Sequence, residues 1–328
     1  MREKTIDIAK GWGMFFVVLG HLTIFGSPLY IVIYHFHMPL FFFLSGWLFK
    51  HTSVKKCMIK KTKRLLLPYM FYWFYIHLIQ YIWYGIVFSD WNVAVHNWNP
   101  LCGGTLWFLI SLWSINLIVA VSYKMGKWQY AIYLLLFIIG LIMGEKKIQL
   151  PLYASQTMLM LPFFIMGMFF HKKTLLEGQT IYEYLSKRGI LSWEFLVAIL
   201  LFFVPCGLLD INGPVIPNPV QFILTPLSGI IIILIVSRQF SSLWQKMRID
   251  KLGANSLQIY GIHWPLVPFF WFITIPIVMR ITSVVGENLQ GMVVKDLVFL
   301  QVVLAIILTT VSHLTGVLFV KMFPQILK

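Results

Sequence analysis

Long runs of apolar residues, separated by short polar connections, make up most of this chain. A run of roughly 20 apolar residues forms an α-helix long enough to cross about 30 Å of membrane hydrocarbon. The pattern therefore predicts an all-α, polytopic bundle of membrane helices. We expect ten spans, at about residues 6–25, 29–49, 66–88, 104–123, 128–144, 153–170, 190–208, 217–236, 254–279 and 297–320.

The basic residues fall on alternate connections between these spans. With the N-terminus inside, the predicted inner segments hold 22 of the 26 lysines and arginines, and the outer loops keep only Lys146, Lys147, Arg280 and Lys295. Because cytoplasmic loops are enriched in these residues, both termini should be cytoplasmic. The polar connections are each shorter than about twenty residues. We therefore expect one membrane domain over residues 1–328, with no fused soluble domain.

The composition agrees with this interpretation and excludes a soluble core, since 59% of the residues are hydrophobic and only 11% are charged. The formal net charge of +15 would suit a nucleic-acid-binding protein. A basic excess spread over the loops of a membrane protein is instead the usual sign of its topology. Membrane lipid is therefore an expected partner, and nucleic acid is not.

The first span carries three ionisable residues, Asp7, Lys10 and His21, within an apolar segment. In an α-helix Lys10 and His21 lie only about 20° apart around the axis and about 16 Å apart along it. Asp7 lies one turn before Lys10 on nearly the same face. A charged side chain facing lipid costs roughly 2.5 to 3.5 kcal/mol on insertion scales, so this face should meet protein or a water-filled cavity. We predict that it forms a functional site.

The second span contains His37 two residues before Pro39, and Ser45 beside Gly46. Pro39 should kink the helix or start it, which would free backbone carbonyls near His37. Ser45 and Gly46 permit close approach of another helix. An isolated histidine is more often a packed core residue, but its expected depth near His21 favours a substrate-binding role for His37.

Lys61 and Arg64 follow this span, one helical turn apart at the membrane boundary. Positive-inside topology and contact with anionic lipid account for part of this basic run. The two cations together also suit a phosphate-rich cytosolic ligand.

Two further residues are candidates for substrate contacts. Trp107 could stack on a sugar or adenine face or anchor the helix at the interface. His263, followed by Trp264 and Pro265, could mark a packed kink or a substrate contact. No cluster has metal-ligand spacing, so no metal is predicted.

These motifs occur together in a fixed order, and with them the whole chain resembles the acyltransferase-3 family of bacterial integral membrane O-acyltransferases. The motifs are Asp7…Lys10-x10-His21, Phe36-His37-Met-Pro-Leu-Phe-Phe-Phe-Leu-Ser-Gly46, Lys61-x-x-Arg64 before Leu-Leu-Leu-Pro-Tyr69, Leu106-Trp107-Phe108-Leu109, and Ile259-Tyr-Gly-Ile-His263-Trp-Pro265.

The resemblance implies a multi-pass enzyme of the inner (cytoplasmic) membrane. It would transfer an acyl group, usually acetyl, from cytosolic acyl-coenzyme A to a hydroxyl of a cell-surface glycan, such as capsule, O-antigen or exopolysaccharide, or of its lipid-linked precursor. It implies His21 as the catalytic residue, with Lys61 and Arg64 as coenzyme A contacts. Many members have arginine at the position of Lys10, and lysine keeps the charge but not the planar fork of arginine.

The chemistry of the residues agrees with the resemblance. Acyl transfer to a hydroxyl needs a base, which neutral histidine provides, and a donor or cation for the thioester oxyanion. We expect direct transfer with His21 as base, and we expect Asp7 to pair with Lys10 or a neighbouring cation and keep it charged. A glycan or lipid transporter or flippase is the competing hypothesis, because buried charges also suit a translocation path. A membrane-embedded interaction protein is a third.

Overall fold

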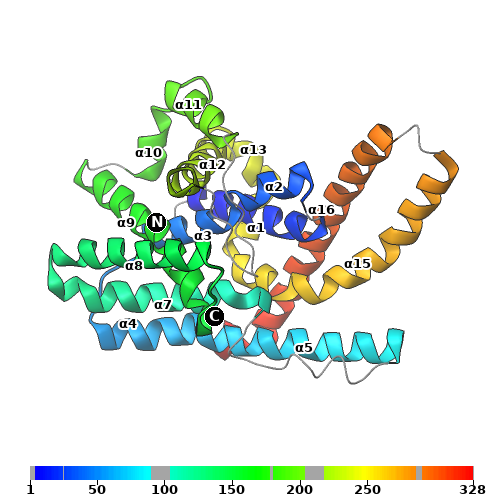
Figure 1. Cartoon of the computed structure of the whole chain (residues 1–328), viewed down its shortest axis with the longest axis horizontal. Coiled ribbons are helices and arrows are strands. Elements are labelled where there is room, and N and C mark those ends of the chain that lie inside the picture. Colours follow the sequence, from blue (N-terminus) through cyan, green and yellow to red (C-terminus); the bar gives the residue numbers. More distant parts are fainter. Residues whose placement is uncertain are drawn as a thin grey trace.

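A computed structural model describes residues 4–24, 26–89, 104–177, 180–203, 218–285 and 290–327, which form helices joined by turns (Figure 1). This confirms the predicted all-α class. The elements are α1 (Lys4–Leu22), α2 (Pro28–Tyr34), α3 (His37–Trp47), α4 (Val54–Lys61), η1 (Thr62–Leu66), α5 (Leu67–Phe88), η3 (Gly104–Leu106), α7 (Trp107–Ser122), η4 (Tyr123–Met125), α8 (Trp128–Glu145), η5 (Pro151–Tyr153), α9 (Ala154–Leu176), α10 (Ile181–Ser186), α11 (Trp193–Phe202), α12 (Pro219–Gln239), α13 (Ser241–Lys246), α14 (Ile249–Ala254), α15 (Ser256–Val285), α16 (Gln290–Met322) and α17 (Pro324–Leu327).

Seven helical segments within the described residues are long and apolar enough to cross a membrane. The chain is therefore a multi-pass membrane protein. The segments are Pro28–Trp47, Val54–Val87, Gly104–Met125, Trp128–Glu145, Pro151–Leu176, Pro219–Gln239 and Val298–Met322. The other predicted spans correspond to α1, which carries three charged residues, to α11, which has 10 residues, and to α15. The total of ten spans and the cytoplasmic termini stay predictions.

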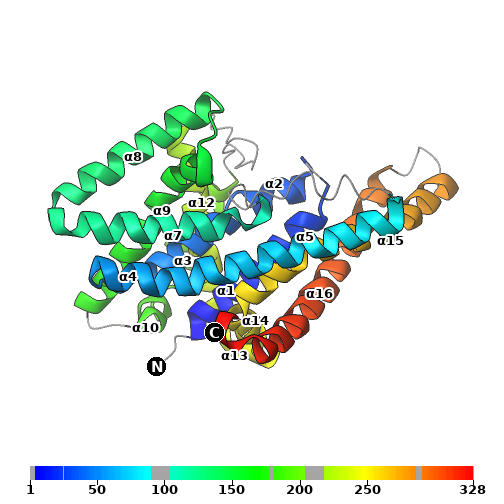
Figure 2. The ribbon, with the colours of Figure 1, turned by 90° about the horizontal axis from the view of Figure 1, so that it is seen from below.

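Helix α1 lies at the centre of the bundle and packs against α3, α12, α14, α15 and α16. Helices α7, α8 and α9 lie to one side of it, and α4 and α5 run along the edge of the molecule (Figures 1 and 2). Helices α15 and α16 pack against each other and project from the opposite side in both views. Asp7 of α1 is therefore buried, and Lys10 and His21 are partly buried, where these groups of helices meet.

The crossing of α3 and α9 depends on two glycines. A β-carbon at Gly46 would overlap the backbone of Phe164, and a β-carbon at Gly167 would overlap the backbone of Phe43. The backbones of the two helices therefore touch, as small residues allow in membrane helix pairs. This confirms the close approach predicted at Gly46, and it holds α3 tightly against its neighbour.

The predicted second span is broken into two helices. Helix α2 ends at Tyr34 and α3 begins at His37, so Pro39 lies in the first turn of α3. Proline is tolerated there because the first turn has no intrahelical partners for its N–H groups. The carbonyl of Ile33 accepts from the N–H of Phe36 over 3.3 Å and also contacts the His37 ring, with 2.8 Å between oxygen and Nδ1. Pro39 therefore starts a helix, which was one of its two predicted roles.

Lys61 and Arg64 lie in a continuous run of helix, as predicted, but its hydrogen bonding is not that of an α-helix throughout. Residues Thr62–Leu66 form a π-helical turn, η1, between α4 and α5. Such turns appear as single bulges within helices, frequently at functional sites. The spacing of a regular α-helix therefore does not describe how Arg64 is placed relative to Lys61.

Candidate functional site

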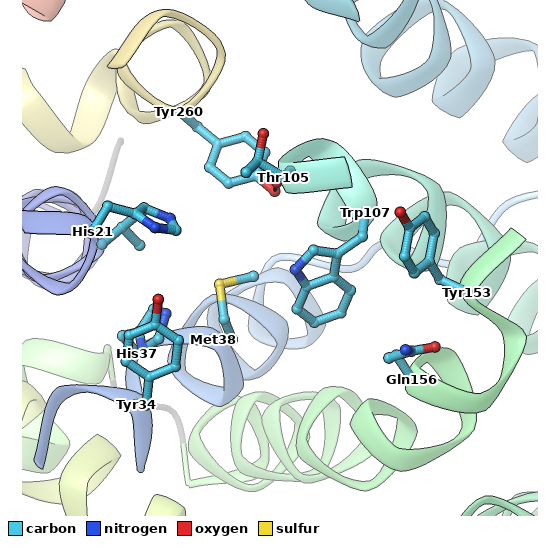
Figure 3. A pocket seen from close by; sticks show the side chains of 10 residues that line it. His21, Tyr34, His37, Met38, Thr105, Trp107, Tyr153, Gln156 and Tyr260 are labelled. Carbon is cyan, nitrogen blue, oxygen red and sulfur yellow. Dashed lines mark hydrogen bonds between the residues drawn. The ribbon is translucent and has the colours of Figure 1, made fainter. Parts of the chain in front are cut away.

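A small cavity of about 30 Å³ lies beside His21 where five parts of the fold meet (Figure 3). We call it the histidine cavity. His21 reaches it from α1, and His37 and Tyr34 lie beside it on the α2–α3 side. Its full lining is Val17, His21, Tyr34, His37, Met38, Thr105, Trp107, Tyr153, Gln156 and Tyr260. The predicted residues His21, His37 and Trp107 thus share one enclosed space.

Three histidines gather at this site. The rings of His21 and His263 are stacked with centroids 5.2 Å apart and planes at 30°. Nδ1 of His37 lies 2.8 Å from the carbonyl of Ile33, and Nδ1 of His263 lies 3.0 Å from that of Ile259. A ring whose Nδ1 donates to a carbonyl keeps Nε2 as an acceptor when it is neutral. Both helices thus orient a histidine acceptor near His21.

Aromatic groups hold the His21 ring and its backbone. The rings of His21 and Trp264 meet edge to face with centroids 4.8 Å apart, and those of His21 and Tyr34 are 6.5 Å apart at 88°. Nε1 of Trp271 donates to the carbonyl of His21 over 3.4 Å. Packed aromatic neighbours restrict rotation of a side chain, so His21 is fixed in one orientation.

The far wall of the histidine cavity combines aromatic and polar groups. Trp107, Tyr153 and Gln156 face His21 across the cavity, and Tyr260 closes one side (Figure 3). The Tyr260 hydroxyl donates to the carbonyl of Thr105, which positions η3 and the start of α7. The buried Oε1 of Gln156 has no hydrogen-bond partner among the described residues. A hydrogen-bond donor such as a hydroxyl that enters the cavity therefore meets an oxygen able to accept from it.

A second cavity of about 150 Å³ adjoins the first on the side of Lys10. We call it the lysine cavity. Val17, Met38 and Tyr260 line both cavities. Its full lining is Lys10, Met14, Val17, Met38, Phe41, Ser45, Leu65, Phe108, Leu109, Leu112, Ser256, Leu257 and Tyr260. Lys10 and His21 therefore stand at neighbouring cavities, about 16 Å apart along one helix.

The remaining predicted residues line neither of these two cavities. Asp7 is buried on α1, where its backbone packs against Gly253 of α14. Arg64 directly precedes Leu65 of the lysine cavity. Nζ of Lys61 lies 5.8 Å from the centroid of the Phe49 ring. His263 lies against His21 and is absent from the cavity lining. Their roles in catalysis and binding stay predictions.

Sequence reasoning missed Tyr34, Tyr153, Gln156 and Tyr260. Gln156 carried one usable signal, because an uncharged polar residue within an apolar span often faces a helix interface or a cavity. Tyr260 lies only three residues before His263 in a motif already singled out. In the part of the chain that the structure describes, no group of three histidine, cysteine or acidic residues could hold a metal ion.

Comparison with known proteins adds independent evidence. The model of a family described as an acyltransferase domain, acyltransferase-3, matches residues 3–317. Nodulation protein NolL of Sinorhizobium fredii (strain NBRC 101917 / NGR234) is 28% identical over 144 residues. That alignment covers 39% of this chain, and the chain spans only 39% of the length of that relative. No solved structure matches the chain.

Proposed function

The chain belongs to the acyltransferase-3 family, and on that premise we propose that it is a membrane O-acetyltransferase. It moves an acetyl group from cytosolic acetyl-coenzyme A to a hydroxyl of a cell-surface polysaccharide or of its lipid-linked precursor. Capsule, O-antigen and exopolysaccharide are the acceptor classes we propose. The protein lies in the inner (cytoplasmic) membrane with both termini in the cytosol.

The observation that carries this proposal is the pair of adjoining cavities along α1. Lys10 lines one cavity and His21 lines the other, and three residues line both. In the proposed topology Lys10 lies toward the cytosol and His21 lies farther out. A donor entering from the cytosol and an acceptor entering from the other side would meet where the cavities join.

We assign the general base to His21. Its neutral imidazole takes the proton of the acceptor hydroxyl, and the hydroxyl oxygen forms a new bond to the thioester carbonyl carbon. The carbon–sulfur bond then breaks, and His21 returns the proton to the departing coenzyme A sulfur. Lys10 lies about 16 Å along α1 from His21, so it offers its positive charge to the anionic donor in the lysine cavity and not to the oxyanion that forms beside His21. Asp7 keeps Lys10 charged.

The other site residues position these reactants. His37 presents Nε2 toward the acceptor hydroxyl, because its Nδ1 is held by the Ile33 carbonyl. Trp107 lines the histidine cavity and offers an aromatic face to a sugar ring. His263 was predicted as a substrate contact, but its stacking on His21 supports a role in holding the catalytic ring. Lys61 and Arg64 bind the phosphates of coenzyme A.

The test is a transfer assay on the full chain, purified and reconstituted in lipid nanodiscs. Radiolabelled acetyl-coenzyme A is supplied together with surface polysaccharide isolated from a strain that lacks this gene. We expect label in the polysaccharide, and we expect NMR spectra of the wild-type polysaccharide to show acetyl groups that the deletion strain lacks. Unchanged acetylation in the deletion strain, with loss of polysaccharide export, would instead support a transporter.

A further inference from the structure

A third cavity, of about 250 Å³, lies at the far end of α7 from the histidine cavity. We call it the aromatic cavity. It is bounded by the start of α8, the end of α9 and the segment after α3, on the side that the proposed topology places in the cytosol. Its lining is Phe49, His51, Tyr123, Gln129, Tyr130, Tyr133, Ile165, Met168, Phe169, His171, Lys172 and Leu175.

Two pairs of stacked rings line this cavity. His51 and Tyr123 are stacked with centroids 3.5 Å apart at 30°, and Tyr130 and Phe169 are stacked 5.3 Å apart at 27°. The Tyr133 hydroxyl lies deeper and donates to Oε1 of Gln129 over 3.1 Å. Flat aromatic faces beside fixed polar groups suit a planar heterocyclic base, which stacks on the rings and bonds at its edge.

Two lysines lie at the same cavity. Lys172 belongs to its lining. Phe49 also lines it, and Nζ of Lys61 lies 5.8 Å from the centroid of the Phe49 ring. Ammonium groups bind phosphate as compact point charges. The combination of stacked rings with nearby cations therefore fits a phosphorylated nucleoside.

Helix α7 connects this cavity to the lysine cavity. Leu112 lines the lysine cavity and Tyr123 lines the aromatic cavity, so about 16 Å of helix separates them. Along this stretch Nε1 of Trp113 donates to Oγ1 of Thr62 over 3.1 Å. Thr62 lies between Lys61 and Arg64 in sequence. The basic pair therefore lies beside the path from one cavity to the other.

We propose that the aromatic cavity binds the adenine nucleotide of the acyl donor. This inference rests on the proposed function and adds the place where the nucleotide is held. The adenine stacks on the rings of Tyr123 and Tyr130, and Lys61 and Lys172 face its phosphates. The pantetheine arm then runs past Arg64 to the lysine cavity, which brings the thioester toward His21.

The test measures binding of adenosine 3′,5′-bisphosphate, a fragment of coenzyme A that lacks pantetheine, to the full chain in nanodiscs of neutral lipid. We expect Tyr123→Ala and Tyr130→Ala each to weaken this binding about tenfold. The matched control is Trp128→Ala, because Trp128 is an exposed aromatic residue on α8 that does not line the cavity. This control variant should bind adenosine 3′,5′-bisphosphate with the affinity of the wild type.

A second measurement compares two acyl donors. Both tyrosine variants should raise KM for acetyl-coenzyme A about tenfold and leave kcat unchanged. With S-acetylpantetheine, which has no nucleotide, the variants and the wild type should transfer at equal rates. Equal losses with both donors would indicate structural damage and would overturn the inference.

The outcomes separate this inference from the proposed function. If the wild type transfers acetyl groups from acetyl-coenzyme A but both tyrosine variants keep its KM, the aromatic cavity is not the nucleotide site and the function stands. If the wild type binds no adenosine 3′,5′-bisphosphate but binds anionic phosphatidylglycerol through this cavity, the inference fails in favour of a lipid headgroup. If the wild type transfers no acetyl group from either donor, the proposed function itself fails.

Discussion

The substitution Gly46→Ala should disturb both the stability of the bundle and its activity. A β-carbon at this position would overlap the carbonyl oxygen, carbonyl carbon and Cα of Phe164, all of which are backbone atoms. Backbone atoms cannot rotate away as a side chain can, so α3 and α9 must separate. Overpacking of this kind costs about 1–3 kcal/mol.

The separation should also reach the site, because α3 carries His37 and Met38 and α9 carries Gln156, and all three line the histidine cavity. The assay heats detergent-solubilised protein and measures the fraction that remains monodisperse by size-exclusion chromatography, alongside acetyl transfer at a permissive temperature. Gly46→Ala should lower the midpoint temperature and reduce transfer.

The control for this experiment is Gly189→Ala. A β-carbon at Gly189 would lie 3.5 Å from Oε1 of Gln239, which is an ordinary van der Waals contact. This variant should have the midpoint temperature and the acetyl-transfer rate of the wild type. If Gly46→Ala also melts at the wild-type temperature, the α3–α9 contact is not as close as the structure has it, and the reasoning fails.

Substitutions at three positions test individual roles in the same transfer assay. Lys10→Ala should lower kcat/KM for acetyl-coenzyme A about tenfold and Lys10→Arg should restore most of it, since the positive charge on the donor side is what matters; equal losses in the two variants would exclude that role. Arg64→Ala should raise KM for acetyl-coenzyme A about tenfold with kcat unchanged, and a fall in kcat alone would contradict phosphate binding. His263→Ala removes the ring stacked on His21, so kcat should fall about tenfold with KM for acetyl-coenzyme A unchanged, and His263→Phe, which keeps a ring there, should restore most of it; wild-type kcat for His263→Ala would refute its positioning role.

The sequence was sufficient to predict the features that depend on the local geometry of a single helix. The 3.6-residue repeat of a helix placed Lys10 and His21 on one face, and these residues line two adjoining cavities. The small size of Gly46 predicted a close helix contact, and α9 provides its partner. Each of these properties follows from a single helix, so no knowledge of the rest of the chain was needed.

The sequence was insufficient where separate helices meet. Tyr260 and Gln156 reach the histidine cavity from α15 and α9, more than a hundred residues away from His21 or from each other. Only the packing of the helix bundle decides which of the many residues within the apolar spans line the same cavity. The π-helical turn at η1 was also unpredicted, because its backbone hydrogen bonding is not evident from the run of basic and leucine residues.

The most direct test of the proposed chemistry compares His21→Ala with His77→Ala in the reconstituted transfer assay. His77 is a suitable control because it is a helical histidine whose Nδ1 lies 2.8 Å from a backbone carbonyl four residues earlier, as that of His37 does, yet it lines neither the histidine cavity nor the lysine cavity. Loss of a general base costs about 10²–10⁴-fold in rate. His21→Ala should therefore lose transfer by at least about a hundredfold while His77→Ala keeps it. Full transfer by a folded His21→Ala variant would contradict the assignment of His21 as the catalytic base.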